Sequence, residues 1–452
     1  MKWKTITLLM FALLIFSACA APASSAEEIV ETAAQSEQTV KQVDMIVDEA
    51  FYPDPLNTFI LNAIYEEATD IHLNVVDGGL VVLFRVDGFV HEKQRLSQRE
   101  GRKLLNQIKA AAGLSASKSL AAPQEGQMRW RDDDRQEKNI RVTIVPVDSE
   151  ECGHLRILSM PEKELEIANL GFSDDHMKGI TESLDSLSGL ILVAGTTGSG
   201  KTTTMYSMVS SRDLSSLVAF SIEDPVEFRL PNSQQLEVNE DHGLTMYQGL
   251  RTILRMDADL IMVGEIRDRD SAIVTARAAM AGRLVLATIH GQDAAAAVDA
   301  LHYLGVPYYV ISSSLRMIVA QKLIRRLCPV CASAREPYVE ESEVFERAGI
   351  EIPKKIFDPV GCDQCNGYGY KGRVGMFETA VITPEAAHKI ASGVHNELLR
   401  QHFRDNGVVP LAIDGITKVA DGITSTSELF QRSHFPGLLA ETQSGISEEA
   451  II

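Results

Sequence analysis

The chain has 452 residues, 45% of them hydrophobic, and a formal net charge of −19. This length allows about two to three domains, and the apolar content is sufficient for globular cores. The acidic balance argues against a nucleic-acid-binding protein. The one local basic run, KLIRRL at 322–327, is interpreted as a solvated helix face. The sequence has no pattern of multiple membrane spans.

Residues 1–26 have the pattern of a secretory signal. Two lysines precede a mostly apolar stretch, Thr5 to Phe16, which is too short to span a bilayer. The following FSAC resembles a lipobox with Cys19 as the lipidated residue, and Ala26 is a second possible cleavage point. Residues 27–52 are predicted to be an acidic linker, because 27–50 contain seven acidic residues and one lysine.

Residues 53–160 are predicted to form a small α+β lobe. The stretch 54–90 predicts a helix and then strands that turn at Asp77-Gly78-Gly79. An ATPase core is expected over residues 161–325, as the next motif indicates.

The stretch GTTGSGKTTT at 195–204 matches the phosphate-binding pattern G-x-x-x-x-G-K-[ST]. The preceding Leu190 to Ala194 predicts a buried parallel strand and 201–211 a helix, which is the context that this motif requires. Backbone N–H groups and the helix N-terminus would bind a polyphosphate. Lys201 would reach the β- and γ-phosphates of ATP, and Thr202 would hold Mg²⁺. The predicted nucleotide-binding residues of the loop are Gly195, Thr196, Thr197, Gly198, Ser199, Gly200, Lys201, Thr202 and Thr203.

Three further strands are predicted downstream, each with chemistry-bearing residues at its end. The segment 220–231, FSIEDPVEFRLP, contains Glu223, Glu227 and Arg229, and could equally be a charged surface loop. Glu265 follows the apolar run Leu260–Val263, where open α/β sheets place ligands, and could orient water or be a solvated strand-end charge. His290 ends the run 283–290 and is either structural or phosphate-sensing.

Four of the six cysteines form two C-x-x-C pairs with 30 residues between them. Two such pairs supply four thiolates for a closed, structural Zn²⁺ site with no open position for water. A redox pair or separate buried thiols are the other interpretations. The predicted ligands, in a region spanning 326–376, are Cys328, Cys331, Cys362 and Cys365. Residues 377–433 are expected to be a helical region and 434–452 a disordered tail.

The four blocks GTTGSGKTTT, IEDPVEFRLP, GLRTILRMDADLIMVGEIRDRD and ATIHGQDAAAAVDALHYLGV resemble the secretion ATPase superfamily. They are most similar to the motors of type II secretion and type IV pilus assembly, from about residue 53 to about 433. The motifs Thr69-Asp70-Ile71-His72 and Arg85-Val86-Asp87-Gly88 resemble signatures of the family's N-terminal lobe. The tetracysteine region is typical of the assembly-type members and not of the retraction-type members.

This resemblance implies a RecA-like P-loop NTPase fold, α/β in class, with a smaller α+β N-terminal lobe and a zinc-binding tetracysteine insertion. It implies an ATP-hydrolysing homo-hexamer that acts on a membrane platform protein, with no nucleic-acid partner. Glu265 matches the catalytic glutamate, Glu223 and Glu227 the acidic-box carboxylates, and His290 the histidine of its box. Basic positions near the phosphates are matched by Arg229, Arg251 and Arg255.

The chain departs from the family pattern at several positions. VVLF precedes Arg85 where further arginines are usual, and KSLAAPQEGQ replaces a basic run. Arginines of that kind stabilise charge on the nucleotide from the neighbouring lobe. Arg283 stands where the family has a histidine, and Gly-Gln follows His290 in place of Thr-Asn. A nucleotide-binding scaffold that has lost turnover is therefore the alternative to the motor.

The signal-like start conflicts with an ATPase, because ATP is scarce outside the cytosol. The start codon could be misassigned, with Met45 as the true start, or the segment could be a real export signal on a divergent relative, or an unusual peripheral anchor. We expect a cytoplasmic motor at the inner face of the membrane, since reduced cysteines also suit that compartment. An exported lipoprotein anchored at Cys19 is the alternative.

Overall fold

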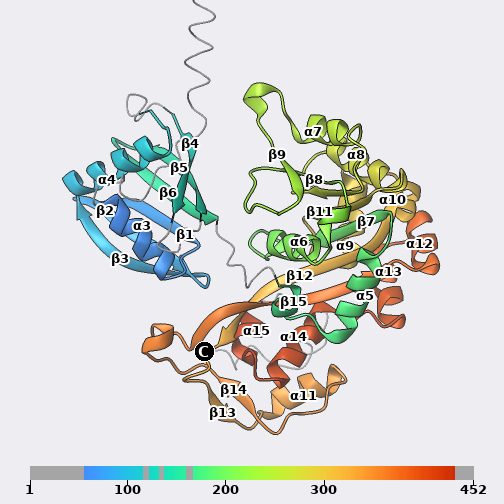
Figure 1. The fold of residues 1–452 in the computed structure, drawn as a ribbon. Helices are drawn as coiled ribbons and strands as arrows, with labels where there is room; N and C mark the ends of the chain where they lie inside the picture. Colours follow the sequence, from blue (N-terminus) through green and yellow to red (C-terminus); the bar gives the residue numbers. More distant parts are fainter. Residues whose placement is uncertain (1–54, 116–121, 132–136, 159–165, 433–452) are drawn as a thin grey trace, which may run out of the picture.

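The computed structural model describes residues 55–115, 122–131, 137–158 and 166–432. It shows two lobes, which lie side by side in Figure 1. The predicted signal, its Cys19, the acidic linker and the tail lie outside the described residues. Within the described ranges, no helix is both long and apolar enough to cross a bilayer.

In the residues that the structure describes, the N-terminal lobe is a six-stranded antiparallel sheet with two helices, in the strand order β3-β2-β1-β6-β5-β4. Apolar side chains of both helices, among them Ile60 and Ile108, share one buried core with the sheet. The predicted turn at Asp77-Gly78 joins β1 to β2. The elements are α3 (Leu56–Tyr65), β1 (Asp70–Val76), β2 (Gly79–Val86), β3 (Phe89–Ser97), α4 (Gln98–Ala111), β4 (Gln124–Arg131), β5 (Glu137–Val147) and β6 (Glu150–Leu158).

The C-terminal lobe is built on a seven-stranded sheet in the order β15-β12-β7-β11-β10-β8-β9. Only β15 is antiparallel to its neighbour, β12, and the other pairs are parallel. The strands are β7 (Gly189–Ala194), β8 (Ala219–Glu223), β9 (Ser233–Glu237), β10 (Leu260–Val263), β11 (Leu284–Ile289), β12 (Leu315–Leu327) and β15 (Tyr370–Val381).

Helices cover both faces of this sheet, which explains why its central strands are continuous apolar runs. In β7, Leu190 and Leu192 face one buried core, and Ile191 and Val193 face the other. The helices are α5 (Asp174–Leu184), α6 (Lys201–Ser210), α7 (Met246–Ile253), α8 (Arg269–Met280), α9 (Ala294–Tyr303), α10 (Tyr308–Ser314), α12 (Pro384–Ala391), α13 (Asn396–Asp405), α14 (Leu411–Ala420) and α15 (Thr426–Arg432). The predicted α/β class with a smaller α+β lobe is confirmed.

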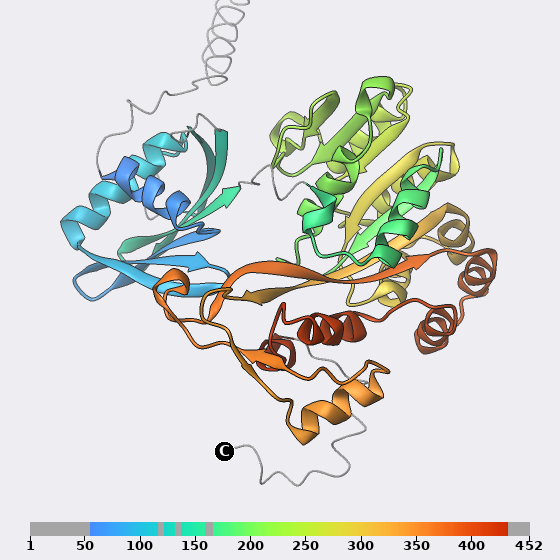
Figure 2. The same cartoon turned by 60° about the horizontal axis from the view of Figure 1, so that its bottom comes forward.

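The tetracysteine region lies between β12 and β15 in the chain. It contains β13 (Ser333–Arg335), α11 (Val339–Arg347) and β14 (Ile356–Asp358), and lies below the long strands β12 and β15 (Figure 2). The predicted boundaries at 325/326 and 376/377 fall inside β12 and β15, because these two strands run from the ATPase core into the region. The interpretation of KLIRRL as a solvated helix face is wrong. This run is part of β12, and Arg325 in it is buried.

Candidate functional site

The phosphate-binding loop connects β7 to α6 and is closely packed. Gly200 caps α6 with a φ of +86°, a conformation that favours glycine. A Cβ at Gly195 would lie 2.7 Å from the backbone oxygen of Gln321 on β12. The Gln321 side chain donates to the Ser199 carbonyl at 2.6 Å. The loop is therefore held against β12, with the N-terminus of α6 directed at its interior.

Lys201 is the first residue of α6, and its side chain folds back over the loop. Its Nζ donates to the carbonyl oxygens of Gly195 at 3.0 Å and Thr196 at 3.1 Å. Burial lowers the pKa of Lys201, and the negative charge of Glu265 opposes that change. These carbonyl oxygens are neutral acceptors. A charged ammonium forms a stronger hydrogen bond with an anion, such as a phosphate, than with a neutral carbonyl.

Glu265 lies just beyond β10, as predicted, and is fixed by two cationic or ionisable side chains. His290, just beyond β11, places Nε2 3.1 Å from Glu265 Oε1. Arg267 pairs with Glu265 Oε2, and its Nη1 contacts Asp224 Oδ2 at 3.0 Å. Because β10 and β11 are parallel neighbours, their ends bring Glu265 and His290 together at one edge of the sheet. A carboxylate held in this way can position a water molecule.

The two acidic-box carboxyl groups have different environments. Glu223 at the end of β8 is 2% exposed and accepts hydrogen bonds from Tyr206, Ser221 and Gln235. Burial raises the pKa of Glu223, although these hydrogen bonds oppose the rise. Burial, together with the nearby charge of Glu223, raises the pKa of Glu227 to about 7.

A cavity of about 970 Å³ lies between the two lobes and joins these groups. Its lining includes Thr197 to Thr203, Glu223, Glu227, Glu265 and His290. Gly195 and Thr196 do not line it, since they lie at the base of the loop, where they accept the Lys201 hydrogen bonds.

Three predicted phosphate-proximal arginines are not among the residues that line this cavity. Arg229 is exposed after β8. Arg251 and Arg255 are exposed on and after α7, where Arg251 Nη1 donates to the Tyr247 hydroxyl at 3.3 Å. Their role in binding nucleotide stays a prediction, and within one chain their positions leave them outside the site.

Cationic residues that the site prediction omitted line the cavity instead. Arg85 and Arg156 come from the N-terminal lobe, and Arg267, Arg325 and Arg373 from the C-terminal lobe. Arg85 belongs to the noted R-x-D-G motif, which was a usable signal. Arg156 has none, because only the pairing of β6 with β1 brings it beside Asp70.

Asp70, in the T-D-I-H motif, orients these N-terminal arginines. Its carboxylate accepts from Arg156 Nε at 3.0 Å, contacts His154 Nε2 at 3.0 Å and lies 3.9 Å from Arg85 Nε. Burial alone would raise the pKa of Asp70, but these hydrogen bonds hold it well below its ordinary value. Asp70 is therefore a permanent anion that holds two cations at the cavity wall.

Arg283 lies away from this chemistry. It directly precedes β11, at the opposite end of that strand from His290, is half-buried, and donates to the Ala281 carbonyl at 2.8 Å. Arg283 does not line the cavity. Within one chain, its difference from the family pattern therefore does not change the lining of the cavity.

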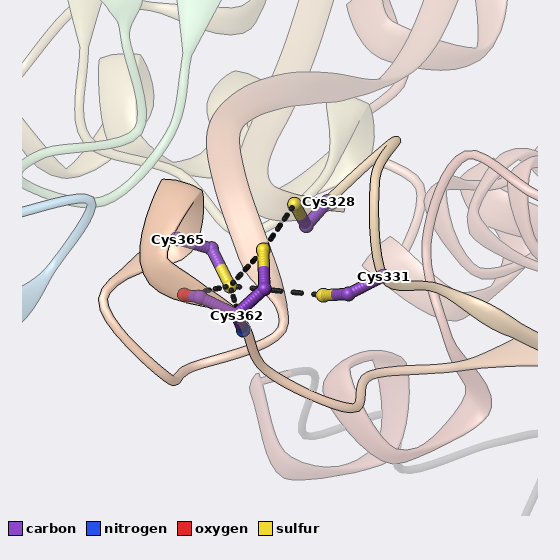
Figure 3. Close-up of side chains that lie close together, drawn as sticks. All are labelled: Cys328, Cys331, Cys362 and Cys365. Carbon is purple, nitrogen blue, oxygen red and sulfur yellow. Dashed lines mark hydrogen bonds between the residues drawn. The ribbon is translucent and has the colours of Figure 1, made fainter.

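The four predicted zinc ligands converge, as Figure 3 shows. Their sulfur atoms all lie within 4.8 Å of one another, and three of the separations are 3.7–3.8 Å. A tetrahedron with Zn–S bonds of about 2.3 Å has S–S edges of about 3.8 Å. Backbone N–H groups of Gly361, Cys362 and Gly369 donate to the sulfurs of Cys331 and Cys365. The donor set fits a structural zinc ion.

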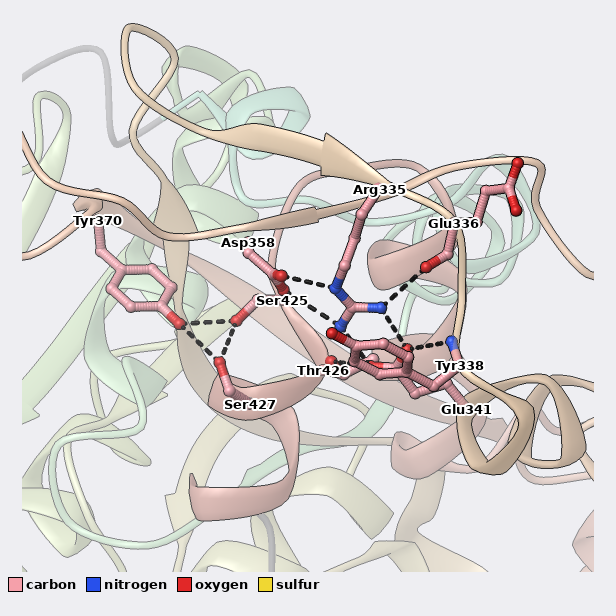
Figure 4. A network of polar contacts seen from close by, with 9 residues as sticks. All are labelled: Arg335, Glu336, Tyr338, Glu341, Asp358, Tyr370, Ser425, Thr426 and Ser427. Atoms are coloured by element: carbon pink, nitrogen blue, oxygen red, sulfur yellow. Dashed lines mark hydrogen bonds and ion pairs between the residues drawn. The ribbon is translucent and has the colours of Figure 1, made fainter.

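A polar network connects the tetracysteine region to the start of α15 (Figure 4). Arg335 binds Glu341 and Asp358, and Glu341 accepts a hydrogen bond from Thr426 at 2.6 Å. The Tyr370 hydroxyl lies 2.6 Å from Ser425 Oγ. The region is therefore joined both to the sheet and to α15.

Comparison with known proteins places this arrangement in a family. The family described as Type II/IV secretion system protein matches residues 46–431. The chain is 33% identical over 405 residues to the Type IV pilus assembly ATPase PilB of Myxococcus xanthus, covering 88% of this chain and 71% of that protein. It is 34% identical over 406 residues to the Type II secretion system protein E of Pseudomonas aeruginosa, covering 89% of this chain and 80% of that protein.

Solved structures show the same fold. The ATPase DotB of Legionella pneumophila superposes with a TM-score of 0.61 at 20% identity, covering 84% of this chain and 95% of that one. The pilus retraction motor PilT with bound ADP superposes with a TM-score of 0.59 at 24% identity, covering 86% of this chain and 99% of that one. The predicted resemblance is confirmed, and the chain belongs to the type II/IV secretion system protein family, whose named relatives are secretion and pilus ATPases.

Proposed function

We propose that the chain is an ATP-hydrolysing motor that powers assembly of a type II secretion pseudopilus or a type IV pilus. The observation that carries this proposal is the shared cavity. Loop residues 197–203, Glu265, His290 and arginines from both lobes line one space of about 970 Å³. Several cations around a helix N-terminus suit a triphosphate, and a carboxylate opposite them suits water activation.

Each side chain has a defined task in this proposal. Lys201 and the first N–H groups of α6 bind the phosphates, and the Thr202 hydroxyl would hold Mg²⁺, which neutralises charge on them. Glu265 positions the attacking water, while His290 and Arg267 hold both of its oxygens. Arg85 and Arg156 stabilise phosphate charge from the N-terminal lobe, in the place of the arginines that the family pattern has elsewhere.

We also propose the assembly and location that the family resemblance implies. The chain would form a homo-hexamer at the cytoplasmic face of the inner membrane and act on a platform protein. The exposed Arg251 and Arg255, outside their own chain's cavity, would then be available to a neighbouring subunit. The four cysteine thiolates would hold one structural Zn²⁺. Sedimentation of the purified protein with ATP tests the hexamer.

ATP turnover by the purified full-length protein tests the function. Lys201→Ala should abolish nucleotide binding, because the loop loses its cation. Glu265→Gln should keep binding but reduce hydrolysis by about 100-fold or more, because water positioning is lost. Lys178→Ala and Glu182→Gln change exposed residues on α5 outside the cavity. As matched controls, they should leave nucleotide binding and hydrolysis unchanged. Binding without turnover in the wild-type hexamer would instead indicate the nucleotide-binding scaffold.

A further inference from the structure

An aromatic contact joins the N-terminal lobe to the tetracysteine region beside the cavity. The Arg325 guanidinium carbon lies 4.1 Å from the ring centroid of Phe89 at the start of β3. It lies 4.3 Å from the ring centroid of Tyr370 at the start of β15. Arg325 therefore contacts one ring from each lobe. Because Arg325 is only 6% exposed, the attraction between its charge and these rings is little screened by water.

Further contacts surround this one and involve the same two segments. Phe89 stacks on Tyr368, with ring centroids 4.4 Å apart. The Tyr368 hydroxyl lies 3.0 Å from His91 Nδ1, and the Gly372 N–H donates to Asp87 Oδ2 at 2.8 Å. We call this set the lobe latch. It comprises Asp87, Phe89 and His91 of the N-terminal lobe, and Arg325, Tyr368, Tyr370 and Gly372 of the C-terminal lobe.

The C-terminal half of the lobe latch is supported by the cysteine cluster. Tyr368 and Tyr370 flank Gly369, whose N–H donates to Cys365 Sγ at 3.2 Å. The Gly369 carbonyl accepts from the Cys328 N–H at 2.9 Å, and the Tyr368 N–H donates to the Cys365 carbonyl at 3.0 Å. The backbone that carries both tyrosines is thus attached to two of the four predicted metal ligands. Fixing the sulfurs therefore fixes the tyrosines.

The N-terminal half of the lobe latch leads directly to the cavity. The turn that carries Asp87 also presents the Gly88 carbonyl, which accepts from Arg85 Nη1 at 3.2 Å. Arg85, Asp87 and Gly88 all line the cavity. On the other lobe, Arg325 and its ion-pair partner Glu428 line it as well. Displacing the turn would therefore displace a cavity arginine.

The geometry points to a second role for the tetracysteine region: the backbone that its cysteine cluster fixes forms the docking surface that holds the N-terminal lobe over the nucleotide site. Phe89 and Tyr368 are positioning residues that set the place of Arg85. Metal binding at the cysteines, more than 200 residues away in sequence from Arg85, then controls how well both lobes bind phosphate. This inference rests on the proposed ATPase function only for its kinetic consequence, and the contact itself is tested independently.

Amide hydrogen exchange of the full-length protein tests the contact. Phe89→Ala should speed exchange in residues 86–92 and in 366–373 by about 2- to 30-fold, the range expected for loss of a cation–aromatic stack. Phe89→Tyr keeps the ring and should restore wild-type exchange. Tyr338→Ala is the matched control, because it removes a ring 4.1 Å from the Arg335 guanidinium but within the C-terminal lobe. Unchanged exchange at both segments in Phe89→Ala would overturn the inference.

Metal removal tests the link between the cysteine cluster and the N-terminal lobe. Exchange is compared in protein loaded with Zn²⁺ and in protein treated with a chelator. Removal should speed exchange at residues 86–92 in the other lobe, while helix α4, residues 98–111, stays at its original rate. An effect confined to residues 326–376 would show that the metal stabilises only its own region, and would contradict the inference.

Kinetics separate this inference from the proposed function. Phe89→Ala should raise the KM for ATP by about 2- to 30-fold with a smaller change in kcat, and with metal content unchanged. A KM equal to that of the wild type would contradict the positioning role. If the wild-type protein does not hydrolyse ATP, the proposed function fails, and the exchange experiments still decide whether the lobe latch exists.

Discussion

Glu227 shows how burial changes a single ionisable group at the cavity. Its pKa of about 7 lies above the ordinary value, so its protonated form is favoured in the folded state. A group with a raised pKa contributes stability at low pH that is lost as the pH rises through that pKa. The wild-type free energy of unfolding should therefore fall between about pH 4.5 and pH 7 because of this group.

Glu227→Gln removes that dependence. We expect the variant to be more stable than the wild type by about 1–3 kcal/mol at pH 8, and equal to it near pH 4.5. Chemical denaturation at both pH values measures this. Glu182→Gln, an exposed carboxylate on α5, should show no such difference. Equal stability of Glu227→Gln and wild type at pH 8 would show that the carboxyl group is not perturbed.

Arg325 and Glu428 form a buried ion pair. Their side chains are 8% and 1% exposed. Removing one partner of a buried pair leaves the other charge uncompensated. Glu428→Gln should therefore lower the free energy of unfolding by about 3–5 kcal/mol. Glu343→Gln breaks an exposed pair with Arg347 and should cost at most about 1 kcal/mol. Similar losses in thermal or chemical denaturation of the two variants would contradict the assignment.

At the scale of elements, β12 and β15 connect the nucleotide-binding sheet to the cysteine cluster. Cys328 directly follows β12, and four residues separate Cys365 from the start of β15. The two strands stay paired up to Leu327 and Tyr370, next to the cysteines, with one register shift between Arg325 and Leu327. Loss of metal at the cysteines is therefore expected to affect the end of the sheet, and not only the loops that hold the metal.

Purified, reduced protein should contain about one zinc per chain, by the ligand count. Cys328→Ser should release it and lower the melting temperature of the C-terminal lobe, because metal binding there contributes folding energy. Elemental analysis and calorimetry measure the two effects. Cys152→Ser on β6 changes a cysteine outside the cluster and should alter neither. Finding no zinc in freshly prepared reduced protein would refute the site.

At the scale of the whole molecule, the cavity exists because two separately folded sheets face each other. Each lobe has its own hydrophobic core, and the cavity lining draws on both. A nucleotide bound to the loop at 197–203 would therefore also contact the N-terminal lobe of the same chain. The N-terminal lobe is thus expected to take part in catalysis.

Arg85→Gln and Arg156→Gln test this expectation. Each should reduce kcat/KM for ATP by about tenfold or more, since a cation directed at phosphate charge is lost. Arg99→Gln, an exposed arginine on α4 outside the cavity, should leave turnover unchanged. Metal content and circular dichroism confirm that each variant is folded. Wild-type turnover in both cavity variants would show that charge stabilisation comes from elsewhere.

Local patterns were sufficient to predict the strand–loop–helix at 189–210, the position of Glu265 after its strand and the pairing of the cysteines. In each case the signal lies within a few tens of residues, because hydrophobic period, loop glycines and ligand spacing are local properties. The same patterns identified the family and therefore the fold. The sequence contains the Arg85 motif, but it does not show that Arg85 lines the phosphate-binding cavity.

Only the tertiary structure decided which charges meet. Arg156 reaches the cavity because β6 pairs with β1, and Arg325 is buried in a strand because β12 lies between β7 and β15. Strand pairing joins residues that are distant in sequence, so a basic run such as KLIRRL has the same local appearance on a helix surface or in a sheet. The family resemblance assigns three further arginines to the phosphates, but the folded chain leaves them outside its own cavity. They are Arg229, Arg251 and Arg255.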